Sequence, residues 1–101
     1  MSKYAIINGE LYSNGKANEM KVNNGADLKV QGSGSGVYKV VGKLTANATP
    51  QPLALIKSSD FSVATSVFDD GIYIVDVSGM YSVSVEDVSG FTKIYGTILS
   101  D

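Results

Sequence analysis

Apolar and polar residues alternate with a period of two through much of the second part of the chain. In residues 37–44, Tyr38 and Val40 fall on one face of an extended chain, whereas Lys39 and Lys43 fall on the other. Such alternation, with β-branched and aromatic residues, is typical of a strand with one buried face. The pattern therefore predicts a strand over residues 37–44.

Residues 72–77 have a different pattern, because both faces are apolar except at Asp76. A strand that is apolar on both faces is either central in a sandwich or covered by a neighbouring subunit. We therefore expect Ile72 and Ile74 to contact a second copy of the chain.

Three consecutive strands are expected near the end of the chain, over residues 72–77, 81–86 and 91–98. Ser78-Gly79 lies between the first two, and Ser89-Gly90 lies between the second and third. Short Gly-containing pairs between alternating runs are typical of tight hairpin turns. The sequence thus predicts an antiparallel meander.

Two shorter strands are predicted over residues 53–57 and 61–65, and no stretch has a convincing helical pattern. Strand signals about ten residues apart are typical of sandwiches and barrels. The predicted fold class is all-β, an antiparallel β-sandwich of immunoglobulin-like or jelly-roll-like type.

The first 36 residues are expected to form an N-terminal arm or hairpin, separate from a β-sandwich body at residues 37–101. Asn8-Gly9 has the composition of a type I′ turn that could join residues 4–7 to 10–13. An isolated hairpin of this size is marginal in water. Glycine and serine alternate over residues 32–36, which predicts a flexible hinge.

Composition excludes several classes of function. A length of 101 residues fits one domain, and a formal charge of −2 offers no basic surface for nucleic acid. No apolar run approaches the ~20 residues that cross a bilayer, and the run after Lys3 is too short for a secretory signal. We expect a protein made in the cytoplasm with neither nucleic acid nor membrane as its partner.

Catalytic chemistry has little support, because the chain contains neither histidine nor cysteine. The adjacent acids are Asp69-Asp70 and Glu86-Asp87, at predicted strand ends. We interpret both pairs as solvated turns, with a calcium site as the alternative. A glycosidase that uses carboxylates alone stays open, but we expect no enzyme activity, no catalytic residue, no metal site and no cofactor.

Six tyrosines and no tryptophan are present, and tyrosine combines a flat apolar face with a polar tip. Three of them are in phase with buried valines and are assigned to the core or its edge: Tyr38, Tyr73 and Tyr81. The better contact candidates are Tyr4, Tyr12 and Tyr95.

The order of these parts resembles the small cysteine-free β-sandwich proteins of tailed phages, in particular head decoration or auxiliary capsid proteins. The resemblance follows from the Gly/Asn-rich start, Gly36-Val37-Tyr38-Lys39-Val40-Val41-Gly42, Thr49-Pro50-Gln51-Pro52-Leu53 and Gly71-Ile72-Tyr73-Ile74-Val75. It covers most of the chain in style, but it contains no invariant functional motif.

The resemblance implies a non-enzymatic virion protein that binds the major capsid protein or another virion protein through its arm and β surface. It also implies a symmetric homo-oligomer, such as a trimer, located in the virion. The arm residues expected to contact the partner are Tyr4, Ile6, Ile7, Leu11 and Tyr12. The alternative is a carbohydrate-binding or receptor-binding module of a phage tail or fibre.

Overall fold

The computed structural model describes residues 5–100, and all strand pairings among them are antiparallel. The strands are β1 (Ala5–Ser13), β2 (Lys16–Ala17), β3 (Met20–Lys21), β4 (Asp27–Lys43), β5 (Gln51–Pro52), β6 (Leu55–Lys57), β7 (Val63–Ala64), β8 (Ile72–Asp76) and β9 (Ser82–Leu99). Within the described residues, no helix is long and apolar enough to span a membrane. The predicted all-β fold class is confirmed.

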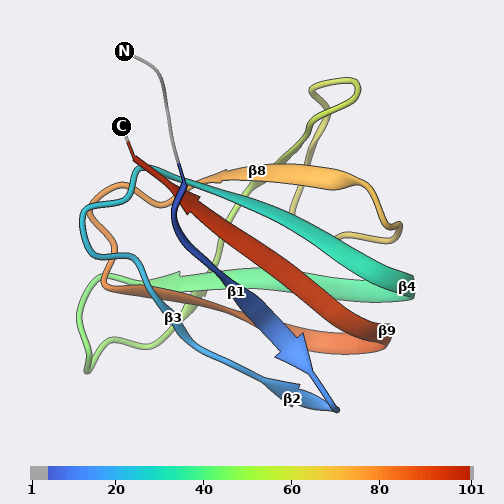
Figure 1. Ribbon diagram of the computed structural model, residues 1–101, viewed down its shortest axis with the longest axis horizontal. Helices are drawn as coiled ribbons and strands as arrows, with labels where there is room; N and C mark the ends of the chain where they lie inside the picture. Colours follow the sequence, from blue (N-terminus) through green and yellow to red (C-terminus); the bar gives the residue numbers. More distant parts are fainter. Residues whose placement is uncertain (1–4, 101) are drawn as a thin grey trace.

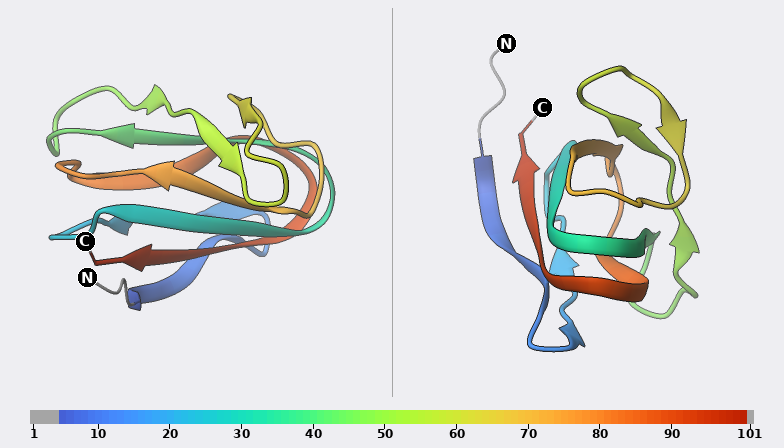
Figure 2. Two further views of the ribbon diagram at one scale, coloured as in Figure 1. Left: turned by 90° about the horizontal axis from the view of Figure 1, so that it is seen from above. Right: turned by 90° about the vertical axis from the view of Figure 1, so that its right-hand side faces the viewer.

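The two longest strands, β4 and β9, form the centre of the fold. They pair from Asp27 opposite Leu99 to Lys43 opposite Ser82, and both turn back on themselves at the right-hand side of Figure 1. Around the first half of β4 the strand order is β2-β1-β9-β4-β8-β6-β7. Around its second half, β3 pairs with β9 and β5 pairs with β4. One folded ribbon therefore supplies strands to two layers, which gives the predicted sandwich (Figure 2).

Glycines occupy the bend because the two strands approach each other closely there. Gly36 has φ 154° and Gly90 has φ 83°. A Cβ atom on Gly36 would overlap the carbonyl oxygen of Ser89, and one on Gly90 would overlap that of Ser35. The prediction of a flexible hinge at residues 32–36 was wrong, since this segment lies inside β4 and is paired with β9.

The N-terminal segment is part of the sandwich over its described residues. β1 pairs with β9 from Ala5 opposite Leu99 to Ser13 opposite Lys93, and it continues through Asn8 and Gly9 without a turn. The predicted hairpin at Asn8-Gly9 and the separate arm ending at residue 36 were therefore wrong. Asn8-Gly9 lies inside β1 and residues 32–36 lie inside β4, so the glycines of both segments are part of extended strands and do not form a linker.

The first hairpin turn lies instead at Asn14-Gly15, where φ is 52° and 75°. Ser13 and Lys16 pair on either side of it. A two-residue loop with both φ angles positive has the character of a type I′ turn, which favours Asn-Gly. Sequence signals for turns thus identified the right chemistry but did not say which Asn-Gly pair forms the turn.

The predicted C-terminal meander was also wrong. β8 pairs with β4 and β6, and no pairing joins it to β9. The turn at Ser78-Gly79 carries the chain between layers, with the Met80 amide donating to the Val77 carbonyl at 3.1 Å. Ser89-Gly90 lies at the bend inside β9. Ser78-Gly79 therefore connects the two layers, and Ser89-Gly90 forms a bend within one strand; neither is a hairpin turn of a meander.

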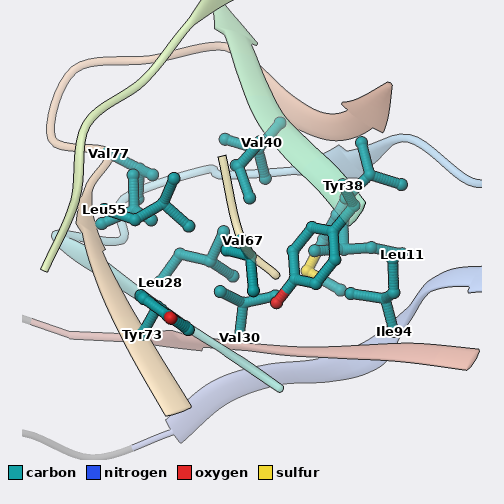
Figure 3. Close-up of a cluster of buried hydrophobic side chains, with 14 of the residues drawn as sticks. Leu11, Leu28, Val30, Tyr38, Val40, Leu55, Val67, Tyr73, Val77 and Ile94 are labelled. Atoms are coloured by element: carbon teal, nitrogen blue, oxygen red, sulfur yellow. The ribbon is translucent and has the colours of Figure 1, made fainter. Parts of the chain in front are cut away.

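The core fills the space between the layers (Figure 3). Tyr38 is 0% exposed and packs edge-on against Phe91, with ring centroids 5.0 Å apart. Its buried hydroxyl has no hydrogen-bond partner among residues 5–100, and burial raises the pKa of Tyr38 well above its usual value. Tyr38 and Tyr73 are buried as predicted, whereas Tyr81 is only half-buried.

Candidate docking surface

The outer face of the larger layer is defined by one row of directly paired residues. Residues opposite each other in an antiparallel pair project from the same face of a sheet. The row crosses the layer from β1 to β7 through Asn8, Thr97, Lys29, Ile74, Ile56 and Val63. These six side chains therefore share one face, although they come from six strands.

Polarity changes along this row. At its β1 end, the Thr97 hydroxyl donates to Asn8 Oδ1 at 2.8 Å, and Lys29 follows as the next residue. At its β7 end the three residues are apolar, and Val63 is 68% exposed. An exposed apolar cluster rimmed by polar residues is typical of a protein interaction site.

The neighbouring row extends the apolar cluster by one position. Tyr95 pairs with Gln31, and Gln31 pairs with Ile72. Both Tyr95 and Ile72 are exposed, and with Lys29 and Thr97 they line a hollow of about 220 Å³. We use the name apolar face for Ile56, Val63, Ile72 and Ile74, which are contributed by β6, β7 and β8.

The hairpin between β6 and β7 presents an aromatic residue beside the apolar face. This loop projects at the top of Figure 1 in yellow-green. Phe61 is 76% exposed and has φ 61°, an uncommon conformation for a bulky residue. Its amide donates to the Lys57 carbonyl, and the Lys57 amide donates to the Ser62 carbonyl, both at 2.8 Å. The loop therefore holds an apolar side chain in solvent at a conformational cost.

Asp60 fastens the tip of this hairpin. Its Oδ1 accepts from the Ser62 hydroxyl at 2.7 Å and from the Ser62 amide at 2.9 Å. These two hydrogen bonds lower the pKa of Asp60, with the hydroxyl contributing most. The charged form of the carboxyl is therefore the one that holds the loop.

Asp69 braces the next loop, in which Phe68 is exposed. Its Oδ2 lies 2.8 Å from Lys57 Nζ, and its Oδ1 accepts from the Gly71 amide at 2.9 Å and the Tyr73 hydroxyl at 3.1 Å. The Lys57 hydrogen bond, followed by that of Gly71, lowers the pKa of Asp69. Both carboxylate oxygens are thus engaged within the protein, which favours the turn interpretation of Asp69-Asp70.

The other acidic pair lies beside the bend. Asp87 Oδ2 is 3.6 Å from Lys39 Nζ, and Asp87 has φ 55°. Over residues 5–100, no group of three acidic side chains is assembled in a way that could hold a metal ion. Asp87 thus forms an ion pair next to the bend.

The residues predicted as arm contacts differ in how exposed they are. Leu11 is 0% exposed and belongs to the core, so its assignment as a partner contact was wrong. Ile7 and Tyr12 are half-buried against the same core. Ile6 is exposed near the start of β1, at an irregularity in the pairing with β9. Tyr4 lies outside the described residues.

Ile72 and Ile74 lie together on the apolar face, and their role as contacts stays a prediction. Sequence analysis missed Ile56 and Val63, although both fall in strands that it predicted. The missing information was the register between strands, which places Ile56 opposite both Ile74 and Val63. Alternation within one strand does not reveal a patch built across three.

Known proteins share this fold at low sequence identity. No protein-family model matches the chain, and no curated protein matches it. The crystal structure of SPBc2 prophage-derived protein YomS is similar with a TM-score of 0.73 and 21% identity, over 98% of this chain and 92% of that chain. The crystal structure of PBSX exported protein XepA is similar with a TM-score of 0.79 and 18% identity, over 99% of this chain and 39% of that chain. The fold therefore occurs both as nearly a whole chain and as part of a longer one.

Proposed function

We propose that this chain is a non-enzymatic structural protein of a phage particle that docks through its apolar face. The observation that carries the proposal is the cluster of Ile56, Val63, Ile72 and Ile74 on the outer sheet, next to polar residues of β4. A prophage-derived protein with the same fold over most of its length supports the phage context. The finer assignment is a capsid decoration or auxiliary protein.

The partner that we propose is another virion protein, such as the major capsid protein, together with further copies of this chain. Apolar side chains at the centre of an interface with a polar rim are the usual arrangement of a specific contact. Lys29 and Gln31 on β4 supply such a rim on one side of the apolar face. A symmetric homo-oligomer would bury the same patch on each copy.

Strand addition at a sheet edge has less support than face-to-face docking. The outermost strands β2, β5 and β7 each contain two residues, and β5 includes Pro52. The start of β1 is the longer open edge, because β2 pairs with β1 only at Tyr12 and Ser13. Short edges and edge prolines disfavour pairing with another chain. We therefore propose the apolar face as the main docking surface, with Ile6 on the open edge of β1 as an outlying contact.

The absence of catalysis is likewise part of the proposal. Asp69 and Asp87, one from each adjacent acid pair, already face lysines. The hydrogen bond from Lys57 lowers the pKa of Asp69, and a carboxyl with a lowered pKa is a poor general acid near neutral pH. The described carboxylates thus suit turn geometry better than acid-base chemistry.

The first test is the mass of the purified protein by light scattering at several concentrations, with the double variant Ile56→Lys/Ile72→Lys beside it. We expect a discrete oligomer that the double variant dissociates. Leu44→Ser removes an apolar side chain that is more exposed than Ile56 or Ile72 and lies away from this face, and it should leave the oligomer intact. A wild-type monomer at every concentration would contradict self-association.

The second test addresses the particle itself. Phage particles purified from cells that carry this gene should contain the protein by mass spectrometry, in a fixed ratio to the major capsid protein. The double variant should be lost from particles while its circular dichroism spectrum stays that of the wild type. Particles without the wild-type protein would contradict the virion assignment.

Carbohydrate binding is the second candidate function, favoured by the hollow beside Tyr95. An exposed tyrosine ring next to Gln31 and Lys29 combines an apolar platform with hydrogen-bond donors. A sugar array compares the wild type with Tyr95→Ala. Glycan binding that the variant loses would favour this function. If no glycan on the array binds the wild type, carbohydrate binding is contradicted and docking stays as the proposed function.

A further inference from the structure

A second hollow lies at the end of the molecule away from the bend. It has a volume of about 310 Å³, and its walls are formed by Leu44, Leu53 and Met80, with Thr49 and Gln51 at its margin. The loop that follows β4 contributes to it and is drawn in green at the lower left of Figure 1. The volume corresponds to about ten water-sized units of about 30 Å³ each. It falls at the lower end of the range for small-ligand pockets.

Gly42 lies at the wall of this hollow, and its lack of a side chain lets Met80 and Leu53 pack against its backbone. A Cβ atom at Gly42 would lie 2.7 Å from Met80 Sδ and 3.0 Å from Leu53 Cδ1. The methionine side chain is flexible and adapts to the shape of what it contacts. Leu44, which is 68% exposed, forms an outer wall. The hollow is therefore apolar on three sides and open to solvent.

A charged hollow adjoins the apolar one and shares Leu44 and Met80 with it. This neighbour has a volume of about 220 Å³ and is also lined by Lys21 and Tyr81. Lys21 Nζ donates to the Tyr81 hydroxyl at 2.6 Å and lies 4.4 Å from the centroid of the Tyr81 ring. The hydrogen bond raises the pKa of Lys21, so its ammonium form is favoured.

The rim carries one excess positive charge. Lys43 Nζ is 3.1 Å from a carboxylate oxygen of Glu19, which also accepts from the Ser82 hydroxyl at 2.7 Å. Glu19 thus balances Lys43, and Lys21 supplies the excess charge next to the apolar walls. The whole chain has a formal charge of −2. A local positive charge beside an apolar hollow is complementary to a molecule with an aliphatic part and an anionic end.

We propose that the two hollows form one binding site for an aliphatic carboxylate of medium chain length. The aliphatic part of the ligand lies between Leu44, Leu53 and Met80. Its carboxylate accepts hydrogen bonds from Lys21 Nζ and the Tyr81 hydroxyl. Charge-assisted hydrogen bonds of this kind orient a ligand whose remaining contacts are non-directional. The site is separate from the apolar face and does not depend on it.

Isothermal titration calorimetry with decanoate, below the concentration at which it forms micelles, tests the site. We expect one molecule to bind per chain. Butyrate, which is too short to reach the apolar walls, and decanol, which has no charge, should each bind at least about tenfold more weakly, equivalent to about 1.4 kcal/mol. Binding of decanol as tight as that of decanoate would overturn the proposal.

Two variants test where decanoate binds. Lys21→Gln removes the excess charge and should weaken decanoate binding about tenfold, with a smaller dependence on salt. Leu44→Asp sets a carboxylate at an exposed wall position and should abolish binding without disturbing the core. Val63→Ser, on the apolar face, is the matched control and should bind as the wild type does. Equal loss in Val63→Ser, or none in Lys21→Gln, would overturn the proposal.

Discussion

Gly36 and Ser89 approach so closely where β4 and β9 bend that a Cβ atom on Gly36 would overlap the carbonyl oxygen of Ser89. The contact joins residues that are 53 positions apart in the chain and pairs the strands at the point where they change layer. It explains why glycine is needed here, because both the close approach and the positive φ exclude a side chain.

Gly36→Ala should therefore destabilise the protein by about 3 kcal/mol or more, as measured by urea unfolding. Gly15→Ala is the control, since Gly15 also has a positive φ but has no neighbouring atom within 4 Å of its Cβ position. That control should cost only about 1–2 kcal/mol. Equal losses would mean that the close approach contributes nothing.

Leu11→Ala should destabilise the protein by about 2–5 kcal/mol, the usual cost of truncating a fully buried leucine. Leu11 is 0% exposed and packs in the core. Ile6→Ala, five positions earlier in β1, should cost less than about 1 kcal/mol because Ile6 is exposed. Chemical denaturation of both variants decides between a core strand and a partner-binding arm, because in a detached arm neither truncation would change the stability of the free protein.

Phe61→Asn should raise the stability of the free protein by about 0.5–1 kcal/mol, because asparagine tolerates the positive φ of this position better than phenylalanine does. Little burial is lost, since Phe61 is largely exposed. Phe68→Asn is the control, because Phe68 is similarly exposed without a positive φ. Differential scanning calorimetry should show a higher Tm for the first variant alone.

Asp69→Asn should lower stability at pH 7 by less than about 1 kcal/mol, as is usual for a solvent-screened ion pair. The pKa of Asp69 is lowered in the folded protein, by Lys57 first. Its contribution is therefore fully present above the unfolded-state pKa of about 3.9 and is lost as the pH falls through the lower folded value.

The measurement for Asp69 is urea unfolding between pH 7 and pH 2. The difference between the wild type and Asp69→Asn should shrink on the acid side of pH 4, and the Asp70→Asn control should not reproduce this change. A difference that stays constant over this range would show that the brace does not depend on ionisation of Asp69.

The sequence predicted which residues are extended and, at many positions, which face they occupy. Tyr38 and Tyr73 are buried as their alternation indicates. The path of the strands was harder to predict from the sequence, because a glycine next to serine or asparagine is compatible with either a turn or a bend. Asn14-Gly15 forms a turn, whereas Ser89-Gly90 lies at a bend in a continuous strand. Local chemistry is the same in both, and only contacts distant in sequence distinguish them.

Less of the candidate sites than of the fold could be predicted from the sequence, for the same reason. Ile72 and Ile74 were identified because a strand that is apolar on both faces needs a cover. Ile56 was missed because its place beside Ile74 depends on the pairing of β6 with β8. The hollow above Gly42 joins residues from 42–53 to Met80, which no local pattern connects.

The position of β9 in the sheet has a consequence for synthesis on the ribosome. β9 pairs with β1, β3 and β4, so each layer lacks its central neighbour until residues 82–99 have been made. Before then the apolar residues of β4 have no partner strand along most of their length. Topologies dominated by such distant pairings fold slowly, in milliseconds to seconds. The nascent chain therefore exposes apolar residues of β4 that the folded protein buries, and it does so until its latest strand has been made.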